Sequence, residues 1–146
     1  MKKSNIILKP ITKSDYQFLY DLMMERTQNI NIEHNTMPTY IEHVKFIKTK
    51  PYYRWLMIIC DNYKVGTIYL TKKNEIGVFI KKDCSGKGVG QKAMKLLMDR
   101  YPKSYYLANI NPKNRNSISF FKKIGFKPLK IVFRYGSIVN EKNKTL

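Results

Sequence analysis

The spacing of apolar residues predicts a strand followed by two helices in the N-terminal part of the chain. Asn5–Ile11 alternates apolar and polar positions, as a strand does when one of its faces is buried. Thr12 then begins a helix, because Asp15 stands three residues later as a capping-box partner and apolar residues follow at the helical period. Thr39 and Glu42 repeat this signature and predict a short second helix.

The middle of the chain is predicted to form three strands joined by short polar turns. Trp55–Cys60 is a continuous apolar run, which is typical of a strand buried on both faces. Asp61–Asn62 is a turn signal, Val65–Leu70 follows it, and a second polar turn leads into Glu75–Ile80. Because connections this short join antiparallel neighbours, we expect a meander.

The rest of the chain predicts two more helices and two more strands. A helix follows the segment 81–90, and Tyr105–Ile110 is the next strand. Asn114–Ile124 is a helix, and Leu129–Tyr135 is the last strand. The predicted order is βααβββαβαβ, an α/β (α+β) fold with a mixed, mostly antiparallel sheet flanked by four helices.

Length and composition favour a single domain over residues 1–146. No repeat, low-complexity tract or linker interrupts the pattern, and hydrophobic residues make up 43% of the chain, as in globular proteins. No apolar run could span a bilayer, and the N-terminus lacks the apolar stretch of a signal peptide. The two cysteines and two histidines are dispersed. We therefore expect a cytoplasmic protein with no membrane association and no bound metal.

The formal net charge of +18 indicates an anionic partner. Lysine outnumbers arginine 23 to 5, however, and the lysines are scattered over the whole chain. Arginine would be the better residue for bidentate phosphate recognition, whereas an AT-rich genome produces excess lysine without any functional demand. A phosphorylated cofactor or an acidic substrate is therefore favoured over nucleic acid.

The most informative local pattern is the glycine-rich segment Ser85–Gly90, which lies between a predicted strand and a predicted helix. Glycines there let backbone N–H groups converge on one point, and the helix N-terminus adds partial positive charge. This arrangement predicts a pyrophosphate site. A P-loop would need a hydroxyl residue where Gly88 stands, and a dinucleotide fold would need Gly-x-Gly-x-x-Gly in a parallel unit, so neither alternative fits.

Two motifs together resemble the GNAT superfamily of N-acetyltransferases. The family signature Gln/Arg-x-x-Gly-x-Gly/Ala matches Ser85–Gly90 at both glycines, although Ser85 replaces the usual Gln or Arg. The second signature is Asn-x-x-Ala/Ser, an aromatic residue and Gly-Phe, which is matched by Asn114–Ser117, Phe121 and Gly125–Phe126. The predicted element order is also that of the family, so the resemblance covers nearly the whole chain.

The resemblance implies transfer of an acetyl group from acetyl-CoA to a primary amine, without a metal. In this family the fourth and fifth strands splay apart, and the pantetheine arm binds between them. The glycine-rich loop holds the pyrophosphate, and a backbone N–H near Phe79 or Ile80 would polarise the thioester carbonyl. The residues implied to contact the cofactor are Val78, Phe79, Ile80, Gly86, Lys87, Gly88, Val89, Gly90, Gln91, Asn114 and Phe121.

Two residues are candidates for the general base. Glu75 occupies roughly the place where some relatives use a glutamate that acts through water, and an ordinary polar residue at a strand edge is the alternative. His43 titrates near neutral pH and lies in Tyr40–Phe46, which resembles a helix of members that acetylate nucleotide-linked amino sugars. A packed or solvated histidine is the alternative there. Cys84 is discounted as a nucleophile, because direct transfer needs no acyl-enzyme.

The proton donor to the leaving thiolate is open, because Phe121 stands where many members carry a tyrosine. Tyr105, Tyr106 and Tyr135 are candidates that the sequence does not rank, and water is another.

The acceptor site is implied to lie in Arg26–Tyr40, which includes His34, and in the C-terminal strand. A small-molecule amine such as an amino sugar, free or linked to a nucleotide, fits the positive charge. The resemblance also implies a homodimer formed through the C-terminal strand, as in many relatives.

Two other functions stay open. One is a non-catalytic GNAT-like module that binds acetyl-CoA or an anion, which Phe121 favours. The other is a basic RNA- or ribosome-associated protein, whose affinity would fall steeply with salt.

Overall fold

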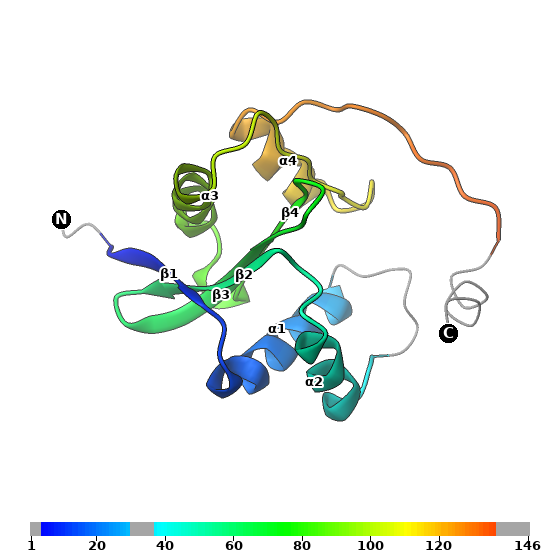
Figure 1. The fold of residues 1–146 in the computed structure, drawn as a ribbon. Helices are drawn as coiled ribbons and strands as arrows, with labels where there is room; N and C mark the ends of the chain where they lie inside the picture. The colour runs from blue at the N-terminus through cyan, green and yellow to red at the C-terminus, as the bar shows by residue number, and fades with distance from the viewer. Residues whose placement is uncertain (1–3, 30–36, 137–146) are drawn as a thin grey trace.

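The computed structural model describes residues 4–29 and 37–136 and has a four-stranded antiparallel sheet at its centre (Figure 1). The strands pair in chain order: β1 (Ile6–Pro10), β2 (Arg54–Cys60), β3 (Tyr63–Leu70) and β4 (Ile76–Ile80). Asp61 and Asn62, between β2 and β3, have φ values of 49° and 74°. Tight two-residue hairpins need such positive angles, so the predicted turn and the predicted meander are both confirmed.

Four α-helices flank this sheet in the described part of the chain. Their bounds are α1 (Tyr16–Asn29), α2 (Tyr40–Lys48), α3 (Val89–Arg100) and α4 (Arg115–Lys123), with short 3-10 turns η1 (Lys13–Asp15) and η2 (Lys82–Cys84) before α1 and α3. Both predicted capping boxes form, since Thr12 N donates to the Asp15 carboxylate and Thr39 N to the Glu42 carboxylate, each at 2.8 Å. None of the helices described is long and apolar enough to cross a membrane.

Alternate strand positions divide the side chains between two helix layers. Leu56, Ile58 and Ile68 pack with residues of α3, whereas Met57 packs with Leu19 of α1 and Ile47 of α2. In Figure 1, α3 and α4 accordingly lie on one side of the sheet, and α1 and α2 on the other. The predicted burial of β2 on both faces is confirmed. Each such side chain contributes roughly 1.5–3 kcal/mol of burial energy.

A bulge in the β2–β3 pairing helps to position the end of β4. Ile58 pairs with Gly66 but Ile59 pairs with Lys64, so Val65 is the extra residue on β3. The carbonyl of Val65 accepts a hydrogen bond from Lys81 N at 2.7 Å. The chain leaving β4 is therefore fixed to β3 just before η2, which leads to the glycine-rich loop.

Two predicted strands are not strands in the structure. Within the described part of the chain, Tyr105–Ile110 makes one bridge, between Leu107 and Glu75, and this bridge is parallel. The prediction for Leu129–Tyr135 is wrong, because this segment has no ladder partner among the described residues and runs away from the sheet (Figure 1). Its apolar alternation suits a strand, but the neighbour it would pair with, 105–110, is not itself a strand. The described order is therefore βααβββαα.

Phe133→Ala should change the free energy of unfolding by less than about 0.5 kcal/mol, because the Phe133 side chain is 90% exposed. Phe121→Ala should lower the free energy of unfolding by about 3–5 kcal/mol, because Phe121 is 7% exposed. It lies in the core on the α3 side of the sheet, which is the larger of the two core clusters. Urea denaturation of both variants measures the difference. A loss above about 1 kcal/mol for Phe133→Ala would contradict the exposed arrangement of Leu129–Tyr135.

Candidate cofactor and catalytic site

Sheet pairing stops at the outer edge of β4. Ile76 N donates to the Leu107 carbonyl, and Leu107 N donates to the Asn74 carbonyl, both at 2.8 Å. Because backbone groups alternate sides along a strand, the N–H and C=O of Val78 and Ile80 face the same outer side as those of Ile76. No described strand pairs with them there. The edge therefore offers unpaired backbone donors and acceptors to an extended ligand.

The three β4 residues predicted to contact the cofactor separate into two groups. Val78 and Ile80 present backbone groups at the open edge and side chains to the larger core. Phe79 pairs inward with Thr67, and its ring lies on the opposite face, where it meets a guanidinium. Of the two residues named for polarising a carbonyl, Ile80 is thus the one whose N–H faces the edge.

The glycine-rich loop joins β4 to the N-terminus of α3. Gly86 and Gly88 have φ values of 77° and 79°, a left-handed conformation that favours glycine, and a side chain at either would meet nothing within 4 Å. Gly88 is the N-cap of α3, and no side chain makes a capping hydrogen bond there. The first N–H groups of the helix are therefore available to an anion. The exposed side chains of Lys87 and Gln91 border the same turn.

Gly90 and Val89 serve the packing of α3. A Cβ at Gly90 would lie 3.1 Å from Cε1 of Phe120, so the missing side chain lets α3 approach α4 closely. The side chain of Val89 is 6% exposed and belongs to the larger core. Any cofactor contact by these two residues would therefore use their backbone.

The two predicted contacts on α4 have structural roles. Asn114 is the N-cap of α4, and its side-chain oxygen accepts from Ser117 N at 3.1 Å, which leaves the amide NH₂ for a ligand. Phe121 packs in the core, with ring centroids 5.1 Å from Phe120 and 5.0 Å from Phe126. Both cofactor contacts stay predictions.

Glu75 is held at the point where β4 opens. Its carboxylate accepts hydrogen bonds from the Thr71 hydroxyl at 3.1 Å and from the Asn109 side-chain amide. The side chain is half-buried, so it is fixed and still accessible. Neither supporting residue was predicted, because Thr71 looked like part of a turn and Asn109 like part of a strand. A carboxylate held in this way can accept a proton at a defined place.

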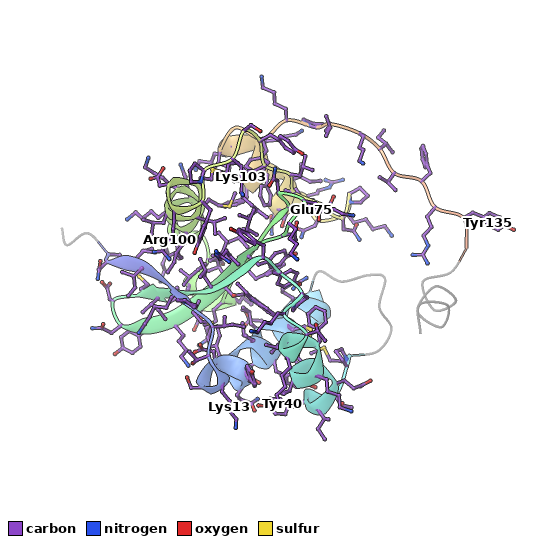
Figure 2. The ribbon with its side chains drawn as sticks, viewed as in Figure 1. Lys13, Tyr40, Glu75, Arg100, Lys103 and Tyr135 are labelled. Atoms are coloured by element: carbon purple, nitrogen blue, oxygen red, sulfur yellow. The ribbon has the colours of Figure 1, made fainter. Side chains whose placement is uncertain are left out.

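His43 lies on the inner face of α2, away from this point. It is 6% exposed, its ring centroid is 5.6 Å from that of Tyr20, and its Nε2 has no hydrogen-bond partner among the described residues. Burial lowers the pKa of His43 below its ordinary 6.5. Figure 2 shows Tyr40, which begins α2, far from Glu75. The structure does not bring the two base candidates together, and His34 lies outside the described residues.

The candidate proton donors are dispersed. The Tyr106 hydroxyl donates to the Tyr101 carbonyl at 2.7 Å and accepts from Lys103 N, so it fastens the end of α3. Tyr105 is 57% exposed, and Tyr135 lies in the extended C-terminal segment (Figure 2). None of these phenols is tied to Glu75 by a hydrogen bond in the described structure.

The described residues support neither a cysteine nucleophile nor a metal site. Burial and the neighbouring Asp83 carboxylate raise the pKa of the Cys84 thiol, which keeps it protonated. No group of three His, Cys, Asp or Glu side chains in the described ranges could hold a metal ion.

An aromatic cluster beside β4 was not predicted. The Arg26 guanidinium carbon lies 3.6 Å from the centroid of the Phe79 ring. The Tyr69 ring is 6.0 Å from Phe79 and stacks on Tyr52 at 3.8 Å with an interplanar angle of 4°. Arg26 carried a signal as the first residue of the region expected to border the acceptor, and Phe79 as an implied cofactor contact, whereas Tyr52 and Tyr69 carried none.

Comparison with known proteins identifies the family. Residues 5–127 match the acetyltransferase (GNAT) domain family, and the chain belongs to this family. A curated relative, the peptidyl-lysine N-acetyltransferase YjaB of Salmonella typhimurium, is 29% identical over 73 residues, which are 50% of this chain and 49% of the relative. The match therefore spans about half the length of that relative.

Solved structures of the same fold cover most of the chain. A domain from Methanocaldococcus jannaschii DSM 2661 has a TM-score of 0.72 and 25% identity, and the match covers 88% of this chain and 92% of that one. The Salmonella typhimurium protein yncA, solved with its cofactor acetyl-CoA, has a TM-score of 0.67 and 18% identity over 84% of this chain and 79% of its own. The predicted GNAT fold is confirmed, whereas the subgroup acting on nucleotide-linked amino sugars stays a prediction.

His43→Phe should make the fold less sensitive to acid. Because the pKa of His43 is lower in the fold than its ordinary 6.5, the unfolded chain binds the proton more readily, and stability falls as the pH drops through this range. Phenylalanine keeps the ring and removes the proton site. Urea unfolding at about pH 7.5 and about pH 5 should show a smaller loss for the variant than for the parent. Equal losses would contradict a neutral, buried imidazole.

Proposed function

We propose that this chain transfers an acetyl group from acetyl-CoA directly to a primary amine. The observation that carries the proposal is the open edge of β4, which runs into an uncapped, glycine-rich helix N-terminus. An extended arm with amide groups fits the former, and a pyrophosphate fits the latter. A CoA thioester joins these two features in one molecule. The acetyl-CoA bound to yncA, which shares the fold, supports the same reading.

The proposed mechanism assigns few roles to side chains. The N–H of Ile80 polarises the thioester carbonyl at the open edge, and the glycine-rich loop anchors the pyrophosphate. Glu75 accepts the proton of the amine, directly or through water, as the N–C bond forms. The C–S bond breaks, and because Phe121 has no hydroxyl, water protonates the leaving thiolate. Binding and orientation supply most of the acceleration.

The acceptor is proposed to be a small amine such as an amino sugar, free or nucleotide-linked. The net charge of +18 favours an acceptor with negative charge over a polycation. The relative YjaB acts on peptidyl-lysine, so a protein acceptor is the competing substrate class. A homodimer and a cytoplasmic location stay predictions, and a small-molecule partner stays favoured over nucleic acid.

A non-catalytic acetyl-CoA-binding module is the second candidate function. The core position of Phe121 favours it, because the side chain at this motif position is an aromatic packing residue without an acidic proton. Both functions need the same cofactor site. Only turnover distinguishes them.

Gly88→Ala should weaken acetyl-CoA binding at least tenfold, because a left-handed alanine strains the turn that aims the helix N–H groups. Gly125→Ala is the control: its φ is 105°, so an alanine is strained there too, and it follows α4 without touching the loop. Isothermal titration measures both affinities. In parallel, acetyl-CoA at about 100 times its Kd should raise the Tm of the parent by roughly 5–10 °C. Equal weakening by both variants would count against the loop as the cofactor site.

Glu75→Gln should lower kcat by about 10²–10⁴ and leave the affinity for acetyl-CoA unchanged, because glutamine keeps the shape and loses the basic oxygen. Asp99→Asn, on the exposed side of α3, is the control carboxylate. A free-thiol assay over a panel of primary amines measures turnover. Unchanged kcat in Glu75→Gln would remove Glu75 from the mechanism, and His43→Phe in the same assay would then test the second base candidate.

A further inference from the structure

The last turn of α1 places a cation against the face of the sheet that carries Glu75. Arg26 lies over the Phe79 ring, and the preceding Glu25 accepts a hydrogen bond from Lys82 N, just after β4. These contacts hold the end of α1 beside the strand edge proposed to bind the thioester. Arg26 is half-buried, so its position is both fixed and reachable.

The charge of Arg26 is not neutralised by the protein that the structure describes. No ion pair or hydrogen bond of its guanidinium is found among residues 4–29 and 37–136, apart from the contact with the ring. Burial lowers the pKa of Arg26, and the guanidinium nevertheless stays protonated in any protein. A single ring face offsets only part of the hydration that a guanidinium loses. The five N–H donors are therefore suited to an anion that the described residues do not supply.

Two phenols extend the donor set. Tyr52 and Tyr69 stack in parallel at 3.8 Å, and Tyr69 lies next to the Phe79 ring that carries Arg26. Burial raises the pKa of both hydroxyls, and the Arg26 charge opposes this rise only in part. Both phenols therefore keep their protons at neutral pH, and the hydrogen bond between their hydroxyls leaves one O–H of the pair to donate. One planar cation and one free O–H donor form a group suited to a carboxylate or a phosphate.

The cluster and the proposed base share one face of β4. Side chains alternate along a strand, so those of positions 75 and 79 lie on the same face, with Gly77 between them. The Tyr69 ring occupies the space that a side chain at Gly77 would need, since a Cβ there would lie 2.2 Å from Tyr69 Cζ. Glu75 is close enough to Tyr69 to contribute to the rise of its pKa, after burial and against Arg26. Glu75 and Arg26 therefore lie along the same face of the sheet, on either side of the Tyr69 ring.

We infer that Arg26, Tyr52 and Tyr69 bind an oxyanionic group of the acceptor, a carboxylate or a phosphate, while its amine faces Glu75. This inference rests on the proposed acetyl transfer and narrows its substrate class to amines that carry an oxyanion. It excludes polyamines and other purely cationic acceptors. It also identifies Arg26 as a residue that determines specificity and does not take part in the chemistry.

The binding test uses three two-carbon amines that differ at one end: 2-aminoethyl phosphate, β-alanine and ethanolamine. The full chain is first saturated with CoA, so that the glycine-rich loop is occupied. The side-chain Nε–H signals of the five arginines are then followed by NMR during each titration, with the Arg26 signal assigned from Arg26→Gln. We expect a saturable shift of the Arg26 signal with one or both anionic amines and none with ethanolamine. The stronger of the two anionic responses decides between phosphate and carboxylate.

Kinetics test whether the bound anion belongs to the acceptor. Arg26→Gln should lower kcat/KM for the preferred anionic amine at least tenfold, mainly through KM, and leave that for ethanolamine unchanged. Arg26→Lys should restore part of the loss, because it keeps the charge without the planar donor fork. Arg54→Gln is the matched control, since Arg54 also lies over a tyrosine ring, that of Tyr53 at 4.1 Å, but at the start of β2. It should change nothing.

Failure of the inference is distinguishable from failure of the proposed function. If CoA shifts the Gly86 and Gly88 amide signals but the Arg26 signal responds equally to all three amines, or not at all, the inference alone is overturned. An equal effect of Arg26→Gln and Arg54→Gln on kcat/KM overturns it as well. If CoA leaves both glycine signals unchanged, the proposed transfer fails, and the assignment of the anion to an acceptor fails with it.

Discussion

The two hydrogen bonds of Leu107, one to Ile76 and one to Asn74, determine where the sheet stops. Up to this bridge β4 has partners on both sides, and beyond it β3 is the only partner among residues 4–29 and 37–136. Unpaired backbone groups at a strand edge are normally shielded or paired, because they attract other chains. Here the unpaired stretch is followed, after the short turn η2, by the glycine-rich loop, so one extended ligand can satisfy both. The position of Glu75 follows from the same bridge, because it is the residue at which the pairing ends.

The alternation of side chains along β4 keeps two tasks apart. The face toward α3 and α4 is core, and it holds the strand rigid while the edge stays open. The face toward α1 and α2 carries Glu75 and Phe79, and the Arg26 guanidinium of α1 lies against it. A ligand at the edge and a ligand on this face would therefore meet at β4 without competing for space. Such separation suits a reaction that joins a large donor to a smaller acceptor.

Local signals in the sequence were sufficient for most of the fold. Capping boxes at Thr12 and Thr39 and the two-residue turn at Asp61 act over a few residues, so their outcome depends little on the rest of the chain. The prediction of a strand at Leu129–Tyr135 was wrong, because strand pairing needs a partner that no local pattern supplies. The glycine-rich loop was predicted correctly from sequence because, as in the capping boxes, its signal lies within a few residues. Arg26, Tyr52 and Tyr69 come from three separate elements, so only the folded chain brings them together.

Gly77 has a consequence for how this chain can diverge. Tyr69 fills the space over its backbone, so any side chain at position 77 has to displace the phenol and alter the surroundings of Arg26 and Glu75. The edge of β4 and the glycine-rich loop would be untouched by such a change. Under the proposed function, a duplicated copy of the gene would change its acceptor site by one substitution at position 77 and keep its donor site. Among homologous sequences, the residue at this position should vary together with the residues that correspond to Tyr69 and Arg26.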